Sequence, residues 1–132
     1  MKKYDNFLKS LENLKEGAKK EPPYTVLEET GMMALFEICF EQSWKVMKAF
    51  LELHGRIVDN IASPRAIIKT AYQCGMITDE KNWLYLLETR NLLAHTYSDE
   101  KLADVIDKIR HDFLSVFETL SDELAERWVV EC

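Results

Sequence analysis

Two long apolar stripes constrain the fold of this chain more than any other feature of its sequence. They lie within residues 25 to 55 and 98 to 128, where large apolar residues recur every three or four positions, the period of one helix face. Their members are Met33, Phe36, Phe40, Trp44, Met47 and Leu51, and Leu102, Ile106, Ile109, Phe113, Phe117, Leu120, Leu124 and Trp128. Helices this long must bury their apolar faces against other helices, so the stripes predict a bundle.

Three shorter segments with the same period bring the number of predicted helices to five. They span about 4 to 19, 63 to 75 and 80 to 97. Either Thr78 or Asp79 is placed to supply the N-cap of the last of these three segments. We therefore expect an all-α, up-and-down antiparallel bundle of about five helices.

Several helix ends carry local signals of their own. Thr25 is followed three residues later by Glu28, which is the pattern of a capping box at a helix start. Gly55 is placed to stop the long second helix, since glycine adopts the left-handed conformation that ends many helices. Ser63 precedes Pro64, and these residue types favour the N-cap and the first helical position. These residues predict where two helices begin and where one ends.

Composition supports an all-α class and a single domain over residues 1–132. Only four Gly and three Pro are present, which argues against a fold rich in strands and turns. No apolar run reaches the roughly 18 to 20 residues that a membrane span needs. The charged start "MKKYDNFLKS" has no apolar stretch behind it, unlike a signal peptide. We therefore expect a cytoplasmic protein.

Cysteine usage and net charge argue against two classes of site. Cys39, Cys74 and Cys132 are odd in number and lack C-x-x-C spacing, which argues against disulfides and zinc. The histidines are also scattered, so we expect neither a metal nor a cofactor. The formal net charge of -6 means that the field of the whole molecule repels nucleic acid. Any contact with RNA must therefore depend on a local cluster of residues.

The predicted fourth helix carries an arginine within its apolar arc. At 100° per residue, Trp83, Leu86, Leu87, Leu93, Ala94 and Tyr97 all fall within about 60° of Arg90. A guanidinium there must meet an acid, an array of carbonyls or a bound anion, because an unpaired buried charge is very costly. Asn91 and His95 are four residues apart, so they form a pair on the flank of this arc.

Each of these residues also has an ordinary structural interpretation. Arg90 can form an ion pair with Glu37 or Glu41 of the second helix, and Glu41 with Lys45 is an ordinary surface pair. A histidine near a helix end, such as His95, is usually a hydrogen-bonded or dipole-compensating residue. Tyr97 on an apolar arc is usually a core residue with a satisfied hydroxyl group. Taken singly, none of them indicates chemistry.

Taken together, these residues resemble a known family. "RNLLAHTY" fits the R-x-x-x-x-H-x-Y pattern, with Asn directly after the Arg, of the HEPN superfamily of helical nucleotide-binding domains. "FEICFEQSWKVMKAFLELHG", "SPRAIIKTAYQCGMI" and a Trp before the motif are similar to the branch called nucleotidyltransferase substrate-binding protein. The resemblance covers nearly the whole chain.

The resemblance implies a homodimer in which two copies of the motif face each other. It also implies a metal-independent ribonuclease, acting as the toxin of a toxin-antitoxin pair, with a minimal (MNT-type) nucleotidyltransferase as partner. In this interpretation His95 acts as the general acid or base, Arg90 stabilises charge on the phosphate, and Asn91 holds the imidazole or a phosphate oxygen. Tyr97 matches the tyrosine to which the partner transfers AMP in such proteins.

Two alternatives stay open at the level of sequence. The chain can be the non-catalytic subunit that binds a nucleotide or substrate for the nucleotidyltransferase, with Arg90 holding a phosphate. It can also be a purely structural bundle with a buried ion pair. The chain has no glycine-rich phosphate loop and no acid pair suited to metal-assisted transfer, so we do not expect it to be the transferase itself.

Overall fold

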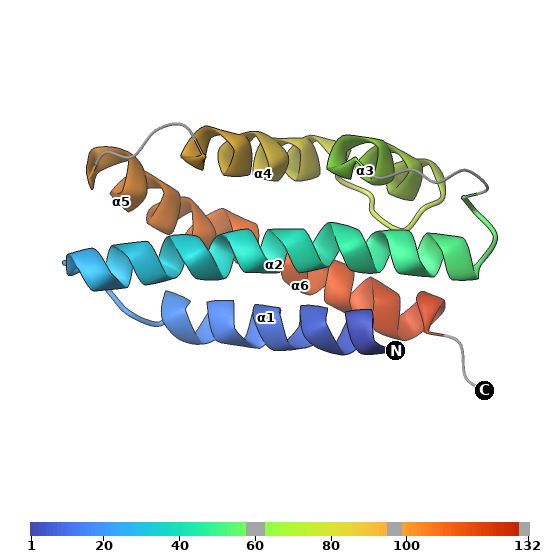
Figure 1. The fold of residues 1–132 in the computed structure, drawn as a ribbon, viewed down its shortest axis with the longest axis horizontal. Coiled ribbons are helices and arrows are strands. Elements are labelled where there is room, and N and C mark those ends of the chain that lie inside the picture. The colour runs from blue at the N-terminus through green and yellow to red at the C-terminus, as the bar shows by residue number, and fades with distance from the viewer. Residues whose placement is uncertain (58–62, 95–98, 130–132) are drawn as a thin grey trace.

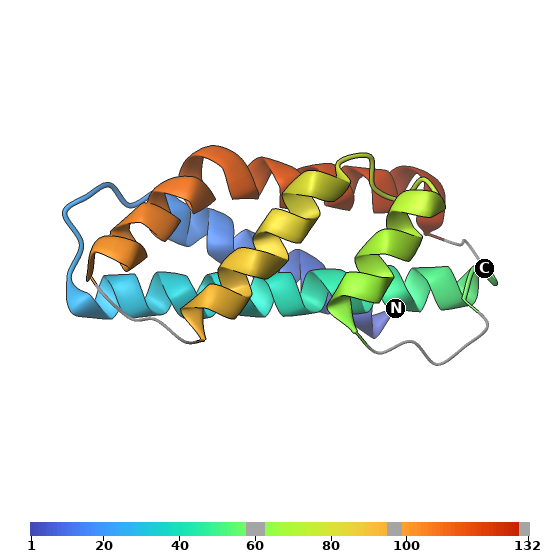
Figure 2. The same ribbon diagram turned by 90° about the horizontal axis from the view of Figure 1, so that it is seen from above.

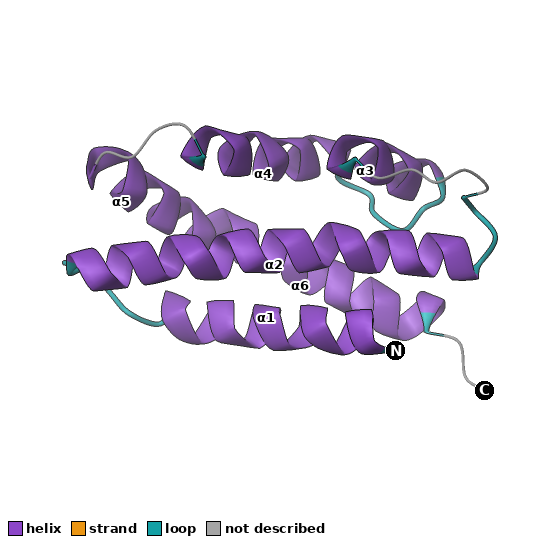
Figure 3. Ribbon diagram, viewed as in Figure 1, coloured by secondary structure: helices purple, strands orange, loops and turns teal. Residues whose placement is uncertain are grey.

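The computed structural model describes residues 1–57, 63–94 and 99–129, and all regular elements in this part of the chain are helices (Figure 3). The elements in chain order are α1 (Lys2–Ala18), α2 (Val26–Leu53), α3 (Pro64–Gln73), α4 (Glu80–Leu93), α5 (Asp99–Lys108), the π-helical turn η1 (Ile109–Phe113), α6 (Leu114–Glu123) and the π-helical turn η2 (Leu124–Trp128). The expected all-α class is confirmed. None of the described helices is long and apolar enough to cross a membrane.

The long helix α2 lies at the centre of the bundle (Figure 1). The helix α1 runs antiparallel along one side of α2, and the continuous rod from α5 to η2 packs behind both. The shorter helices α3 and α4 cross obliquely over α2, α3 near its C-terminal end and α4 nearer its middle (Figure 2). This crossing brings the end of α4 against the middle of α2.

The predicted cap residues form the expected bonds. The backbone N–H of Glu28 donates to Thr25 Oγ1 at 3.1 Å and the backbone N–H of Thr25 donates to Glu28 Oε1 at 2.9 Å, which completes the capping box. The bond from the Thr25 backbone lowers the pKa of the Glu28 carboxyl. Ser63 caps α3 through the backbone N–H of Ala66 at 3.1 Å. Of the two candidates for α4, Asp79 is the N-cap.

Both predicted stripes are buried, and they pack against each other. All residues of the two stripes are less than a tenth exposed. Phe36 of α2 stacks on Phe113 of η1 with ring centroids 5.6 Å apart, and Trp83 of α4 meets Phe117 of α6 edge to face at 5.7 Å. Aromatic side chains of α2 and of α4 therefore both contact the rod from α5 to η2 within the core.

The last helix has a geometry that its sequence pattern did not predict. In two places, three successive residues of its apolar stripe are each four positions apart. These residues are 109, 113 and 117, and then 120, 124 and 128. Repeated steps of four exceed the 3.6 residues of an α-helical turn, so a straight α-helix would rotate these side chains off the core. The wider turns of η1 and η2 fall within these two stretches and keep the stripe facing α2.

The described fourth helix ends before the predicted span does, and residues 95–97 of that span lie outside the described residues. The sequence pattern predicts a helix to about residue 97, whereas α4 ends at Leu93 with Ala94 as its C-cap. Gly55 and Gly75 both have positive φ angles, +69° and +79°, at the ends of α2 and α3 as their sequence positions indicate.

Candidate functional site

Arg90 lies in the last turn of α4 and reaches across to α2. Its Nη2 atom is 3.7 Å from Oε2 of Glu41, and its guanidinium carbon is 5.5 Å from the centre of the Phe40 ring. Of the two glutamates that sequence offered as partners, the structure pairs Arg90 with Glu41. Glu37 forms no ion pair with it among the residues that the structure describes.

The carboxylate of Glu41 is a shared acceptor rather than a partner of Arg90 alone. The indole N–H of Trp44 donates to Oε2 at 3.0 Å, and Lys45 Nζ lies 3.5 Å from Oε1. Two cations, Arg90 and Lys45, thus share one carboxylate. The cluster of Arg90, Glu41, Trp44 and Lys45 therefore keeps one net positive charge, which an anion would neutralise.

Arg90 is less buried than its place on the helix suggested. Its neighbours on the arc, Trp83, Leu86 and Leu93, are buried as expected. The Arg90 side chain itself is 30% exposed, because its long stem lies along the apolar surface while the guanidinium extends toward the carboxylate at the rim. The guanidinium of Arg90 meets an acid, one of the partners that the sequence allowed, and this ion pair lies at the rim of the core, where solvent and ligands can reach it.

Of the other motif residues, the structure describes Asn91 but not His95 and Tyr97. Asn91 is exposed on α4, next to Arg90 in sequence and on a neighbouring flank of the helix. His95 and Tyr97 lie outside the described residues, so their assigned roles stay predictions. The last described residue before them is Ala94, the C-cap of α4.

Sequence reasoning missed how Trp44 and Lys45 join the cluster. Glu41 with Lys45 was interpreted as a surface pair, and Trp44 as part of the core stripe. Both residues follow Glu41 at helical spacing, three and four residues on, so the pattern placed them beside that carboxylate. The missing information was which glutamate Arg90 approaches. No cluster of three or more metal-ligating side chains occurs in the described ranges.

Comparison with known proteins identifies the family. A sequence model described as "Nucleotidyltransferase substrate binding protein like" matches residues 2–126. The chain belongs to this family. A protein named "Probable ribonuclease HepT" from Haemophilus influenzae is 32% identical to this chain over 99 residues, which are 74% of this chain and 67% of that protein. These matches confirm the resemblance to the nucleotidyltransferase substrate-binding branch of HEPN proteins.

A solved structure has the same fold. The crystal structure of a protein from Thermus thermophilus matches with a TM-score of 0.75 at 27% identity. The match covers 89% of this chain and 98% of that chain. The helical arrangement described above is thus shared along nearly the full length of the second protein.

Proposed function

We propose that this protein is a metal-independent endoribonuclease of the HEPN type, and that it acts as a toxin. The observation that carries the proposal is the position of Arg90. Its guanidinium pairs with Glu41 at the rim of the core and stays partly exposed. His95 follows five residues later in the same motif. The relative named as a probable ribonuclease supports the same activity.

The proposed reaction needs only groups that this chain supplies. His95 removes the proton from a ribose 2′-hydroxyl group, and the oxygen attacks the adjacent phosphorus. The bond from phosphorus to the 5′-oxygen breaks, and that oxygen takes up a proton from a second imidazole. The products are a 2′,3′-cyclic phosphate and a free 5′-hydroxyl group. Arg90 stabilises the negative charge that develops on the phosphate, and Asn91 orients the imidazole or a phosphate oxygen.

A homodimer supplies the second imidazole. One chain carries one motif histidine, whereas the reaction uses one base and one acid. Two copies of the motif that face each other across a twofold axis would provide both groups in one cleft. Sedimentation or light scattering should therefore give twice the chain mass of 15.5 kDa. A monomer at the concentration of the assay would remove this part of the proposal.

Cleavage of RNA in the presence of EDTA tests the activity. The wild-type protein should cut single-stranded RNA and leave 2′,3′-cyclic ends, because attack by the neighbouring hydroxyl group requires no metal. His95→Ala and Arg90→Ala should each lower the rate by about 10²- to 10⁴-fold. His111→Ala is the matched control, since His111 is exposed and lies in η1, where its Nε2 is 3.3 Å from Oδ1 of Asp107 in α5. Equal loss in the control, or full activity in His95→Ala, would contradict the assignment.

The family description favours a second candidate function. A protein described as substrate-binding can hold a nucleotide for a nucleotidyltransferase without cutting RNA. Arg90 and Lys45 would then bind the phosphate of the nucleotide. Calorimetry with ATP and AMP distinguishes the two candidates. Nucleotide binding that depends on Arg90, together with intact RNA, would favour the binding subunit over the ribonuclease.

The proposed partner is a small MNT-type nucleotidyltransferase that acts as the antitoxin. Its reaction joins the phenol oxygen of Tyr97 to the α-phosphorus of ATP, with loss of the phenolic proton and release of pyrophosphate. The attached AMP would place a negative charge and a bulky group within the motif that carries Arg90. RNA would then meet both repulsion and a steric block.

Mass spectrometry after co-expression with the partner tests this control. One AMP should be found on the peptide that contains Tyr97, and Tyr97→Phe should remain active in its presence. Tyr72→Phe is the matched control, because Tyr72 is an exposed tyrosine on α3. AMP on another residue, or a Tyr97→Phe protein that the partner still silences by catalysis, would refute the mechanism and leave the ribonuclease proposal in place.

A further inference from the structure

Basic residues outnumber acidic ones at one end of this acidic protein. Segments 1–9, 46–57 and 63–77 contain seven Lys and Arg but only two Asp and Glu, although the whole chain carries -6. Residues 121–129, at the same end, contain three Asp and Glu and one Arg. The three segments lie toward the same end of the bundle, where the start of α1 and helix α3 lie on opposite sides of the end of α2 (Figure 1). A ring contact between Tyr4 and Phe50, with centroids 5.6 Å apart, joins the first two of them.

A pocket of about 210 Å³ opens at this end. It lies between the end of α2, the turn after α3 and the end of η2, and its lining residues are His54, Arg56, Cys74, Gly75, Arg127 and Trp128. Two of these residues are arginines and one is a histidine, while none carries a carboxylate. A pocket with this lining favours an anion.

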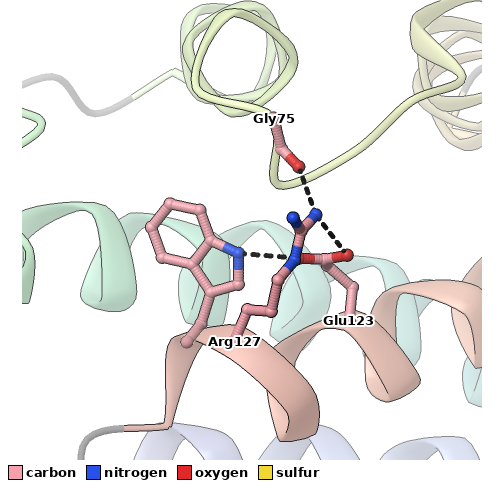
Figure 4. A network of polar contacts seen from close by, with 4 residues as sticks. Gly75, Glu123 and Arg127 are labelled. Carbon is pink, nitrogen blue, oxygen red and sulfur yellow. Dashed lines mark hydrogen bonds and ion pairs between the residues drawn. The ribbon is translucent and has the colours of Figure 1, made fainter.

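The arginine of η2 is held in a fixed orientation. Arg127 Nε donates to Glu123 Oε2 at 2.6 Å, its Nη2 donates to Glu123 Oε1 at 2.8 Å, and Nη2 also reaches the Gly75 carbonyl at 3.5 Å (Figure 4). The carboxylate hydrogen bond raises the pKa of Arg127, which therefore stays charged. Its Nη1 atom takes no part in these bonds. A guanidinium fixed in this way loses little freedom when it binds a ligand.

The carbonyl groups at the pocket are already occupied. Gly75 accepts from Arg127, and the Trp128 carbonyl lies 2.9 Å from Nε2 of His54. A carbonyl oxygen can only accept, so Nε2 of His54 carries the proton and Nδ1 is left for another partner. Arg56 is exposed and forms no ion pair within the described ranges. In a neutral imidazole Nδ1 of His54 is an acceptor, so the donors that the pocket offers an anion are the guanidinium groups of Arg56 and Arg127.

We infer that this pocket binds a phosphate group of the RNA backbone, at a site separate from the motif on α4. The inference rests on the proposed ribonuclease function for its choice of ligand. Two arginines suit the oxygens of a phosphate, which accept paired hydrogen bonds. Arg65 and Lys69 are two further exposed basic residues, in the first half of α3, and several basic residues favour a chain of phosphates over a single one. The second site holds RNA on a protein whose overall charge would repel it.

Binding of a labelled single-stranded 2′-O-methyl oligonucleotide, followed by fluorescence anisotropy, tests the inference. This probe keeps the phosphates but has no free 2′-hydroxyl group, so it stays uncut whether or not the protein is a ribonuclease. Arg56→Ala should weaken binding roughly three- to tenfold and reduce the slope of log affinity against log salt by about one. Arg56→Lys should stay close to the wild type, and Arg56→Glu should lose more than Arg56→Ala.

Lys19→Ala is the matched control. It removes one positive charge from an exposed residue near the opposite end of α1, where Lys19 pairs with Glu16 at 3.0 Å. Equal losses in Lys19→Ala and Arg56→Ala would overturn the inference, because net charge alone would then explain both. Circular dichroism should show both variants folded, since both side chains are exposed.

Two further measurements complete the test. Competition by AMP and by inorganic phosphate identifies the source of the bound phosphate, and RNA cleavage distinguishes failure of the phosphate site from failure of the proposed ribonuclease. AMP and inorganic phosphate should compete weakly with the oligonucleotide. If AMP binds as tightly as the oligonucleotide and loses as much affinity in Arg56→Ala, the RNA backbone is the wrong source. If RNA is never cut but the effect of Arg56→Ala on binding persists, the proposed ribonuclease fails and the phosphate site stands. If cleavage depends on His95 while Arg56→Ala binds normally, the phosphate site fails alone.

Discussion

Breaking the ion pair between Arg90 and Glu41 should cost little stability, although it should change the activity strongly. At the observed separation of 3.7 Å, two unit charges attract by about 1.1 kcal/mol at the dielectric constant of water and by about 4.5 kcal/mol at an effective value of 20. The side chains are 30% and 39% exposed, so the first figure is the closer guide. Ordering two side chains reduces it further. The expected coupling energy is about 0.5 to 1 kcal/mol.

A double-mutant cycle with Arg90→Gln, Glu41→Gln and the double variant measures this coupling. Glutamine at position 41 keeps an oxygen that can accept from Trp44, so the cycle isolates the ion pair. Arg90→Gln also loses its contact with the Phe40 ring, worth about 0.5 to 1 kcal/mol. Its total cost should therefore be about 1 to 2 kcal/mol.

Urea unfolding at low and at high salt is the suitable assay, because guanidinium would screen the pair. The coupling should shrink as salt is added. A buried ion pair behaves differently, since removing one partner then costs about 3 to 5 kcal/mol. A coupling above about 2 kcal/mol that is insensitive to salt would refute the rim placement of Arg90. It would favour a structural ion pair over a phosphate-binding guanidinium.

Three other regions of the protein give separate predictions. Thr25→Ala should cost about 1 kcal/mol in urea unfolding, because it removes the cap of α2. The folded protein lowers the pKa of Glu28 below its ordinary value of 4.5, so the charged carboxylate stabilises the fold at pH values above 4.5. This contribution is lost as the pH falls through the folded pKa, so Glu28→Gln should make the free energy of unfolding fall less steeply at acid pH. Phe36→Ala should cost about 3 to 5 kcal/mol, since its ring is fully buried, and a smaller loss would argue against the described core. Burial raises the pKa of the Cys39 thiol to about 12, so peptide mapping after brief iodoacetamide treatment should find Cys74 labelled well before Cys39.

The sequence predicted the helices and their buried faces because these depend on short-range relations. Every residue of the two stripes is buried, as the helical period indicated. The caps at Thr25 and Ser63 also formed as predicted, because a cap bond spans only three residues. Periodicity was less reliable where the end of a helix depends on its surroundings. The described helix α4 ends at Leu93, before the predicted end at about residue 97, and residues 95–97 lie outside the described part of the chain.

The partner of Arg90 was decided by tertiary structure. Glu37 and Glu41 lie four residues apart on α2, so their side chains differ by about one helical turn, or roughly 5.4 Å along the axis. A choice between them requires the position at which α4 crosses α2, and residues about fifty positions apart set that crossing. The same crossing decides that the guanidinium lies at the rim.

The basic pocket likewise has no signal in the linear sequence. Its arginines are 71 positions apart, at residues 56 and 127, and its histidine contacts a carbonyl group 74 positions away. The sequence by itself determined that five helices form, which faces they bury and which motif they carry, since these follow from local periods and spacings. Only the tertiary structure decided which charges meet, because that depends on how distant helices cross and where their ends come together.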